Sequence, residues 1–482
     1  MLNTFFGIVF YRKNYATVKV FLAKENLFKM TCIYLCNMLR RILFFSCFIF
    51  FISDIKCQNL IFDQYITISQ NSDGFGRPRV KLTANNAPII IWRKDASPKT
   101  LRASKWNGSA FSSPYDILQN GILPSSWDGP EIATKGDTIY VVFTSLATSH
   151  SAIMLIKSFD GGLNFSDTIR VSENNPLHKF RMGNVEINDD GNPVVSYMQY
   201  LLNWTEPKQM VNISLSYGSA FLGATEGSAL ALGEPCDCCK SSLVCDGDKV
   251  FLLFRNNESN MRNSYIAKST DGGISFSSTA DMDDYIWNLT SCPATTPRGA
   301  LSGDSIIVVK RSGATGNNEV VCSSVSAQNL DHLYNQNIDL IPGVIQNYPE
   351  LAVVGDTVLA VWQDNREGYQ DCYISLSTEG SYDLSGSISY TDSSFSGQKI
   401  DPDVEFKNGN IHLVYLNSTE HKIVYVKAYI QLLSSLIEYN DLKPLSPIGQ
   451  IDVLGRNTNN IKGIQIIIDE QRGGKKKLRI KK

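Results

Sequence analysis

Short apolar segments alternate with polar turns along most of the chain, and the pattern repeats. Stretches such as GPEIATKGDTIYVVFT (129–144) and YPELAVVGDTVLAVWQ (348–363) share one order of parts. Each has an alternating segment, a Gly-Asp turn and a strongly apolar segment. Period-two alternation bounded by glycine, asparagine and aspartate predicts β-strands joined by tight turns. The fold class is therefore predicted to be all-β.

Seven such units recur, beginning at residues 77, 129, 183, 240, 298, 348 and 401. An all-strand period of roughly fifty residues is typical of a β-propeller with one four-stranded blade per unit. We expect six or seven blades, and the repeat count favours seven. The period argues against a Greek-key sandwich. The lone strand at 64–70 is expected to supply the outer strand that the last unit lacks and to close the ring.

Two turns are near copies, KSFDGGLNFS (157–166) and KSTDGGISFS (268–277). In each, paired glycines supply positive φ angles and the aspartate can hydrogen-bond the turn amides, so both predict a hairpin turn. These turns resemble the Asp-boxes of the sialidase superfamily, and the resemblance covers most of residues 75–430. The resemblance implies a propeller that acts on glycans. Sialidases have six blades, so a count of seven is a departure from that family.

The two ends of the chain are predicted to carry targeting signals. Residues 38–57 combine Arg40 and Arg41 with a short apolar run, which predicts a signal peptide cleaved between Cys57 and Gln58. An acylated Cys57 is the weaker alternative, because the preceding residues are not small. We interpret 1–37 as an upstream extension, 58–430 as the propeller and 431–482 as a linker with a short β-rich tail. The expected location is secreted or on the outer-membrane surface.

The segment 445–482 resembles the C-terminal sorting signal of the Bacteroidetes type IX secretion system. The matching residues are Asp452, Leu454, Gly455, Arg456 and Gly463. This resemblance implies the type IX secretion machinery as a partner. The alternative is a small strand pair with a solvated lysine cluster.

Composition and charge argue against nucleic acid as a partner. The formal net charge is −2 and no basic patch stands out in the body of the chain, which argues against nucleic-acid binding. No cofactor is expected, and a monomer is expected. With the leader removed, seven cysteines remain, so at least one cannot be in a disulfide.

Four of these cysteines are candidates for a joint role. Cys236, Cys238 and Cys239 precede the inner strand of the fourth unit, and Cys292 precedes that of the fifth. Neighbouring blades bring such positions together, so a disulfide from Cys292 to one of the other three is the favoured interpretation. A thiolate metal site and a redox-catalytic thiol are the alternatives.

The sialidase resemblance implies a set of catalytic residues. Sialidases hold a substrate carboxylate with three arginines, and use a tyrosine nucleophile, an activating glutamate and an aspartate acid/base. The matches are Arg77 or Arg79 for the first arginine, Arg255 for the second, Tyr348 for the nucleophile and Asp95 for the acid/base. The residues expected to contact substrate are Arg79, Asp128, Arg262, Trp287 and Arg298, with core packing as the alternative for Trp287.

Two departures weaken that match. Cys239 occupies the place of the activating glutamate, and Glu234 is the only substitute nearby. The third arginine is missing late in the fifth unit, because Arg298 and Arg311 lie earlier. Two functions therefore stay open: a sialidase-like glycoside hydrolase acting at the axial site, or a non-catalytic surface propeller that binds glycans or protein there.

Overall fold

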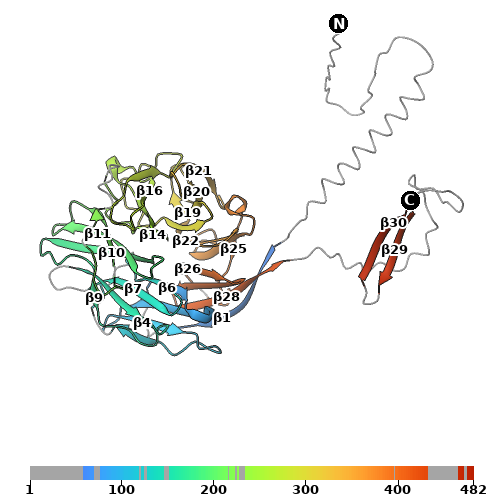
Figure 1. Cartoon of the computed structure of the whole chain (residues 1–482), viewed down its shortest axis with the longest axis horizontal. Helices are drawn as coiled ribbons and strands as arrows, with labels where there is room; N and C mark the ends of the chain where they lie inside the picture. The colour runs from blue at the N-terminus through green and yellow to red at the C-terminus, as the bar shows by residue number, and fades with distance from the viewer. Residues whose placement is uncertain are drawn as a thin grey trace, which may run out of the picture. The chain divides into compact units, whose positions relative to one another are not determined.

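The computed structural model describes residues 58–69, 76–118, 121–123, 128–145, 151–214, 216–222, 225–226, 234–395, 397–432, 465–471 and 475–481. The chain divides into two compact units, one of which is Asn59–Gln431. That unit consists of seven four-stranded antiparallel sheets, which form the seven blades of a β-propeller (Figure 1). The predicted fold class is confirmed, with seven blades.

Each blade is built from strands that follow one another in the chain. Blade 1 contains β2 (Arg79–Leu82), β3 (Pro88–Lys94), β4 (Thr100–Lys105) and β5 (Tyr115–Leu118); blade 2 contains β6 (Glu131–Lys135), β7 (Thr138–Thr144), β8 (Ile153–Ser158) and β9 (Ile169–Arg170). Blade 3 contains β10 (His178–Ile187), β11 (Pro193–Leu201), β12 (Lys208–Ile213) and β13 (Thr225–Glu226); blade 4 contains β14 (Ser242–Asp246), β15 (Lys249–Arg255), β16 (Ser264–Ser269) and β17 (Ser278–Asp281). Blade 5 contains β18 (Arg298–Ser302), β19 (Ser305–Ser312), β20 (Glu319–Ser326) and β21 (His332–Asn337); blade 6 contains β22 (Asn347–Val354), β23 (Thr357–Asp364), β24 (Asp371–Ser377) and β25 (Ile388–Ser389). Three short 3₁₀ helices, η2 (Ala84–Asn86), η4 (Glu258–Asn260) and η5 (Ser381–Asp383), lie in the described connections.

Blade 7 closes the ring with strands from both ends of the unit. It contains β26 (Lys399–Lys407), β27 (Asn410–Asn417), β28 (Lys422–Leu432) and, beside β28, the first strand β1 (Gln58–Thr67). The backbone amide of Ile68 donates to the carbonyl of Ile423 at 2.8 Å just beyond this strand. The expected closure by an N-terminal strand is therefore confirmed.

The innermost strands surround the axis. Each first strand of a blade contacts the first strands of both neighbouring blades, from β2 through β6, β10, β14, β18, β22 and β26 back to β2. The second strands are apolar on both faces because they lie between two layers of core. In β7 (TIYVVFT), for example, every residue after the first is buried.

The hydrophobic core is divided into layers between neighbouring blades. One layer packs Tyr140 and Val142 of blade 2 against Phe180 and Tyr197 of blade 3, all at most 1% exposed. Burying one such side chain is worth about 1.5–3 kcal/mol, so each interface between blades contributes many such increments. Stability is thus spread around the ring.

The two near-copy turns adopt one geometry at the third-to-fourth strand connection. In blade 2, the Ser158 hydroxyl donates to Asp160 at 2.7 Å and accepts from the Gly162 amide at 2.9 Å. In blade 4, Ser269 and Asp271 make the same contact at 2.7 Å. Gly162 has φ +91°, a conformation that favours glycine. These turns lie at the blade edges and do not contribute to the axial site.

The tail contains an antiparallel hairpin, β29 (Gln465–Gln471) and β30 (Lys475–Lys481). The predicted signal peptide and the extension 1–37 lie outside the described residues. Within the part of the chain that is described, no helix has the length and apolar character needed to cross a membrane.

Candidate functional site

A repeated backbone kink shapes the mouth of the propeller, where the innermost strands begin. Arg77 just before β2, Met182 in β10, Tyr348 in β22 and Asp401 in β26 each have a positive φ, between 43° and 63°. In blades 3, 6 and 7 the kink coincides with a β-bulge. Non-glycine residues rarely adopt this conformation, and it is often found at functional sites.

Arg77 contacts two of the other kinked residues, Tyr348 and Asp401. The Arg77 guanidinium lies 4.5 Å from the centre of the Tyr348 ring, and its Nη1 is 3.8 Å from the Asp401 carboxylate. Arg77 is buried, whereas Tyr348 is half-buried at the mouth. Residues of blades 1, 6 and 7 are therefore joined here, and the structure brings together two of the residues matched to sialidase catalysis.

Below the mouth lies an axial charge cluster, formed by Arg79, Glu131, Lys240, Arg298 and Glu350. Glu131 accepts from Arg79 at 3.1 and 3.2 Å, from Lys240 at 3.1 Å and from Arg298 at 3.0 Å. Glu350 pairs with Arg79 at 3.2 Å and with Arg298 at 2.7 Å. The space that these residues line together with Arg77 and Tyr348 is about 10 Å³, room for about one water molecule.

The three cations and two carboxylates of this cluster partly offset one another. Burial alone would raise the pKa of Glu131, but Arg298, Arg79 and Lys240 hold it well below its usual range. Asp403, next to the cluster, has a pKa raised to about 7, mainly by burial and also by Glu350. Arg79 and Arg298 each pair with both carboxylates of the cluster, and their contact with substrate stays a prediction.

Asp128, Asp95 and Glu234 lie apart from Tyr348. Asp128 is buried and accepts from the Thr144 hydroxyl at 2.7 Å and from the Met182 amide at 3.2 Å. Asp95 forms a two-point ion pair with Arg93, one contact of which measures 2.9 Å. Glu234 is exposed, and its backbone carbonyl accepts from Asn257 at 2.7 Å. Among the described residues, no recorded contact joins any of the three carboxylates to Tyr348.

A second group of cations lies between blades 4 and 5. The guanidinium groups of Arg255 and Arg311 lie 5.1 and 5.7 Å from the centre of the Trp287 ring. Arg255 donates to the carbonyls of Arg262 and Arg311, and Arg311 donates to the Pro293 carbonyl at 3.3 Å and to the Asn318 amide oxygen at 2.6 Å. No ion pair to a carboxylate is recorded for either arginine within the described ranges.

The burial of these two arginines has an electrostatic consequence. Burial and the positive charge of Arg255 lower the pKa of Arg311 to about 10, whereas Tyr348 and Cys239 act in the opposite direction. The Nε groups of both arginines are buried and lack a hydrogen-bond partner in the described structure. Arg255 is only 1% exposed, whereas Arg311 is half-buried. The pair is therefore a site of uncompensated positive charge.

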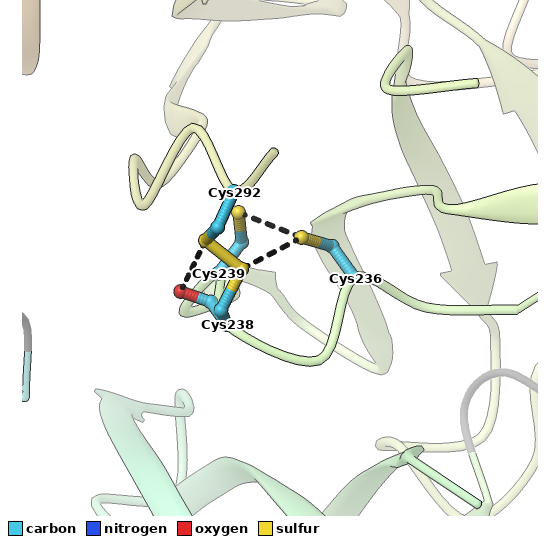
Figure 2. A group of neighbouring side chains, drawn as sticks. All are labelled: Cys236, Cys238, Cys239 and Cys292. Carbon is cyan, nitrogen blue, oxygen red and sulfur yellow. Dashed lines mark hydrogen bonds between the residues drawn. A yellow bond between two sulfur atoms is a disulfide. The ribbon is translucent and has the colours of Figure 1, made fainter. Parts of the chain in front are cut away.

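The four candidate cysteines form one cluster (Figure 2). Cys238 and Cys292 are joined by a disulfide with their Cα atoms 6.3 Å apart. The Cys236 sulfur lies 3.0 Å from that of Cys239 and 3.5 Å from that of Cys238. Arg262 donates to the Cys236 sulfur at 3.2 Å. The loops before blades 4 and 5 therefore converge as expected from neighbouring blades.

The two free thiols of the cluster differ in acidity. The hydrogen bond between Cys236 and Cys239, together with the positive charge of Arg262, lowers the pKa of Cys236 to about 7. Burial raises the pKa of Cys239 well above its usual range. Cys236 is therefore the thiol that ionises first near neutral pH.

The residues matched to catalysis or expected to contact substrate did not include Arg311, Lys240, Glu131 and Glu350. A signal for part of this set was present at the start of the units, where proline precedes a charged residue in RPR (77–79), GPE (129–131), YPE (348–350) and DPD (401–403). Residues at equivalent positions of successive blades face one axis. This repeated dipeptide indicates a ring of charges.

Comparisons with known proteins identify similar solved structures but assign the chain to no family. No family model and no curated protein matches the chain. Among solved structures, a protein of unknown function from Dyadobacter fermentans is 11% identical, with a TM-score of 0.48, covering 77% of this chain and 99% of that one. The polysaccharide lyase Uly1 is 9% identical (TM-score 0.49; 76% and 99% covered), and the NanB sialidase of Streptococcus pneumoniae is 10% identical (TM-score 0.44; 62% and 67% covered). Because these values are low, the propeller assignment rests on the strand pairing of this chain.

Proposed function

We propose that this protein binds acidic glycans at the mouth of the propeller, where Arg311 receives a sugar carboxylate. The observation that carries the proposal is the pair Arg255 and Arg311, two cations with orphaned Nε donors and no carboxylate partner among the described residues. A guanidinium group pairs well with a carboxylate, and a buried donor without a partner favours a ligand that supplies an acceptor. Arg311 is the reachable member, and Arg255 adds positive potential behind it.

Aromatic surfaces support the same proposal. Tyr348 is half-buried at the mouth, and its charge acts to raise the pKa of Arg311. Trp204 is 38% exposed on the loop after β11, with the Arg181 guanidinium 4.0 Å from its ring centre. Exposed aromatic rings beside cations suit the apolar face and the acidic substituent of a sugar.

A second candidate function, hydrolysis with Tyr348 as nucleophile, is favoured by the contact between Arg77 and Tyr348. A tyrosine nucleophile needs an adjacent base. The carboxylates of the axial charge cluster, Glu131 and Glu350, are held by cations, and no base is recorded on the Tyr348 hydroxyl among the described residues. Binding is therefore the function that the geometry supports better.

One experiment separates these functions. The full chain would be assayed for binding of sialylated and uronate oligosaccharides by calorimetry and for turnover of a fluorogenic sialoside. Loss of a charge-assisted contact of about 2 kcal/mol predicts roughly 30-fold weaker binding for Arg311→Gln. Arg170→Gln is the matched control, because Arg170 also donates to backbone carbonyls but lies on an outer strand. Equal weakening in both variants, or no binding by the wild type, would reject the proposal.

Turnover decides the second candidate. If the wild type hydrolyses the sialoside and Tyr348→Phe does not, while both bind the oligosaccharide, the protein is a hydrolase. If neither the wild type nor Tyr348→Phe shows turnover and both still bind the oligosaccharide, the protein is a binding protein.

We also propose export through the signal peptide 38–57 and the tail 445–482. The support is the sequence pattern of both segments. N-terminal sequencing of the protein from a native host should give Gln58 as the first residue. Deletion of 445–482 should abolish release or surface attachment, and unchanged export would contradict the sorting role.

A further inference from the structure

We propose that Cys236, Cys238, Cys239 and Cys292 together form a thiolate site for one thiophilic divalent cation, Zn²⁺, when all four are reduced. Their sulfur atoms all lie within 4.8 Å of one another. A tetrahedral site with metal–sulfur bonds of about 2.3 Å requires sulfurs about 3.8 Å apart. The cluster is therefore already close to the dimensions of such a site. Metal binding requires that the disulfide between Cys238 and Cys292 is reduced, so that these two sulfurs can move apart.

The surroundings compensate the charge of a metal bound by four thiolates. Such a centre carries a net charge of −2. Arg262 donates to the Cys236 sulfur at 3.2 Å, and Arg255 lies close enough to favour the thiolate of Cys236. Neither arginine has a recorded ion pair to a carboxylate within the described residues. Two buried cations beside four sulfurs are the electrostatic complement of this centre.

Backbone amides complete the surroundings. The amide of Ala294 donates to the Cys292 sulfur at 3.2 Å, and the backbone of Thr295 hydrogen-bonds the Cys239 sulfur. Amide-to-sulfur hydrogen bonds orient thiolate ligands and lower their charge density, and they are a common second layer around metal sites. A disulfide staple alone would not require donors on the sulfurs of Cys236 and Cys239, which take no part in it.

The cluster also has an access route. Cys292 is exposed and Cys238 is half-buried, whereas Cys236 and Cys239 lie behind them. An external dithiol, or two external monothiols in succession, can reduce the disulfide, giving two cysteine thiols and one external disulfide. The four thiols then bind Zn²⁺ and release four protons. The site would tie the loop before blade 4 to the loop before blade 5.

The test uses the full chain, reduced anaerobically with a phosphine and titrated with Co²⁺. Four thiolates predict near-ultraviolet charge-transfer bands and intense visible bands that saturate at one equivalent and disappear on addition of Zn²⁺. Cys236→Ala and Cys239→Ala should lose this signal. Cys322→Ala is the matched control, because Cys322 is a buried free cysteine of blade 5 outside the cluster.

A second measurement needs no variant. With one equivalent of Zn²⁺, alkylation of the reduced wild type followed by mass spectrometry should leave Cys236, Cys238, Cys239 and Cys292 protected. Cys245, which is partly buried in β14 of blade 4, should react equally with and without the metal. Failure of Zn²⁺ to protect the four, or a Co²⁺ spectrum unchanged in folded Cys236→Ala, would overturn the proposal.

Discussion

Replacing Glu131 by glutamine tests whether the axial charge cluster stabilises the ring. Glu131 contacts Arg79, Lys240 and Arg298 at 3.0–3.2 Å, and its side chain is 7% exposed. The substitution keeps the shape of the side chain but leaves three buried cations with one fewer anion. Removing one partner of a buried ion pair costs about 3–5 kcal/mol, because the remaining charge stays desolvated. We expect a loss of that size in the free energy of unfolding.

The assay is equilibrium urea unfolding of the full chain at pH 7, followed by tryptophan fluorescence. Glu420→Gln is the control, because Glu420 pairs with Lys422 at 2.7 Å but both side chains are about 30% exposed. An exposed pair is worth 0–1 kcal/mol, so this control should lie within that range. Adding Lys240→Met to Glu131→Gln should recover part of the loss. A loss below about 1 kcal/mol for Glu131→Gln would refute the reasoning, since it would mean that water screens the cluster.

Three further outcomes are expected. Asp403, with a pKa raised from 3.8 to about 7, binds more protons folded than unfolded between those values, so its contribution to stability falls as pH rises through that window. The stability of Asp403→Asn, measured relative to the wild type, should therefore be higher at pH 8 than at pH 4, by at most about 4 kcal/mol. Urea unfolding at the two pH values measures this difference. The same difference between variant and wild type at both pH values would contradict the reasoning. Gly162→Ala should lower the free energy of unfolding by about 1–3 kcal/mol, because φ is +91° and the new Cβ would lie 2.6 Å from Ile89 Cδ1. Gly108→Ala is the control and should cost less, because its new Cβ would meet no atom within 4 Å. Deleting 58–67 should abolish cooperative unfolding, because the edge of β28 loses its partner; a retained sharp thermal transition would argue against ring closure by β1.

The sequence predicted the propeller because its information is local and repeated. A turn such as Gly-Asp and the apolar strand after it define a hairpin regardless of distant residues, and seven copies reveal the period. The convergence of the cysteine loops was predictable for the same reason, since neighbouring units become neighbouring blades.

The pairing of charges across the axis was not predictable in the same way. Glu131 meets Arg298, 167 positions later, only after the ring has closed. Arg255 was matched to a substrate-binding arginine, yet in the structure it is 1% exposed and donates to backbone carbonyls. Sequence pattern identifies the strand that carries such a side chain, but not which neighbours take up its hydrogen bonds.

Ring closure by the first strand has a kinetic consequence. The Ile423 amide and the Ser69 hydroxyl, joined at 3.0 Å, are 354 positions apart. During synthesis β1 emerges first but finds its partner β28 only after the other six blades have been made. Closing so long a loop is slow compared with forming hairpins within a blade. The final, cooperative step of folding is therefore expected to wait for the complete chain, and until then β1 is a free edge that a chaperone can hold.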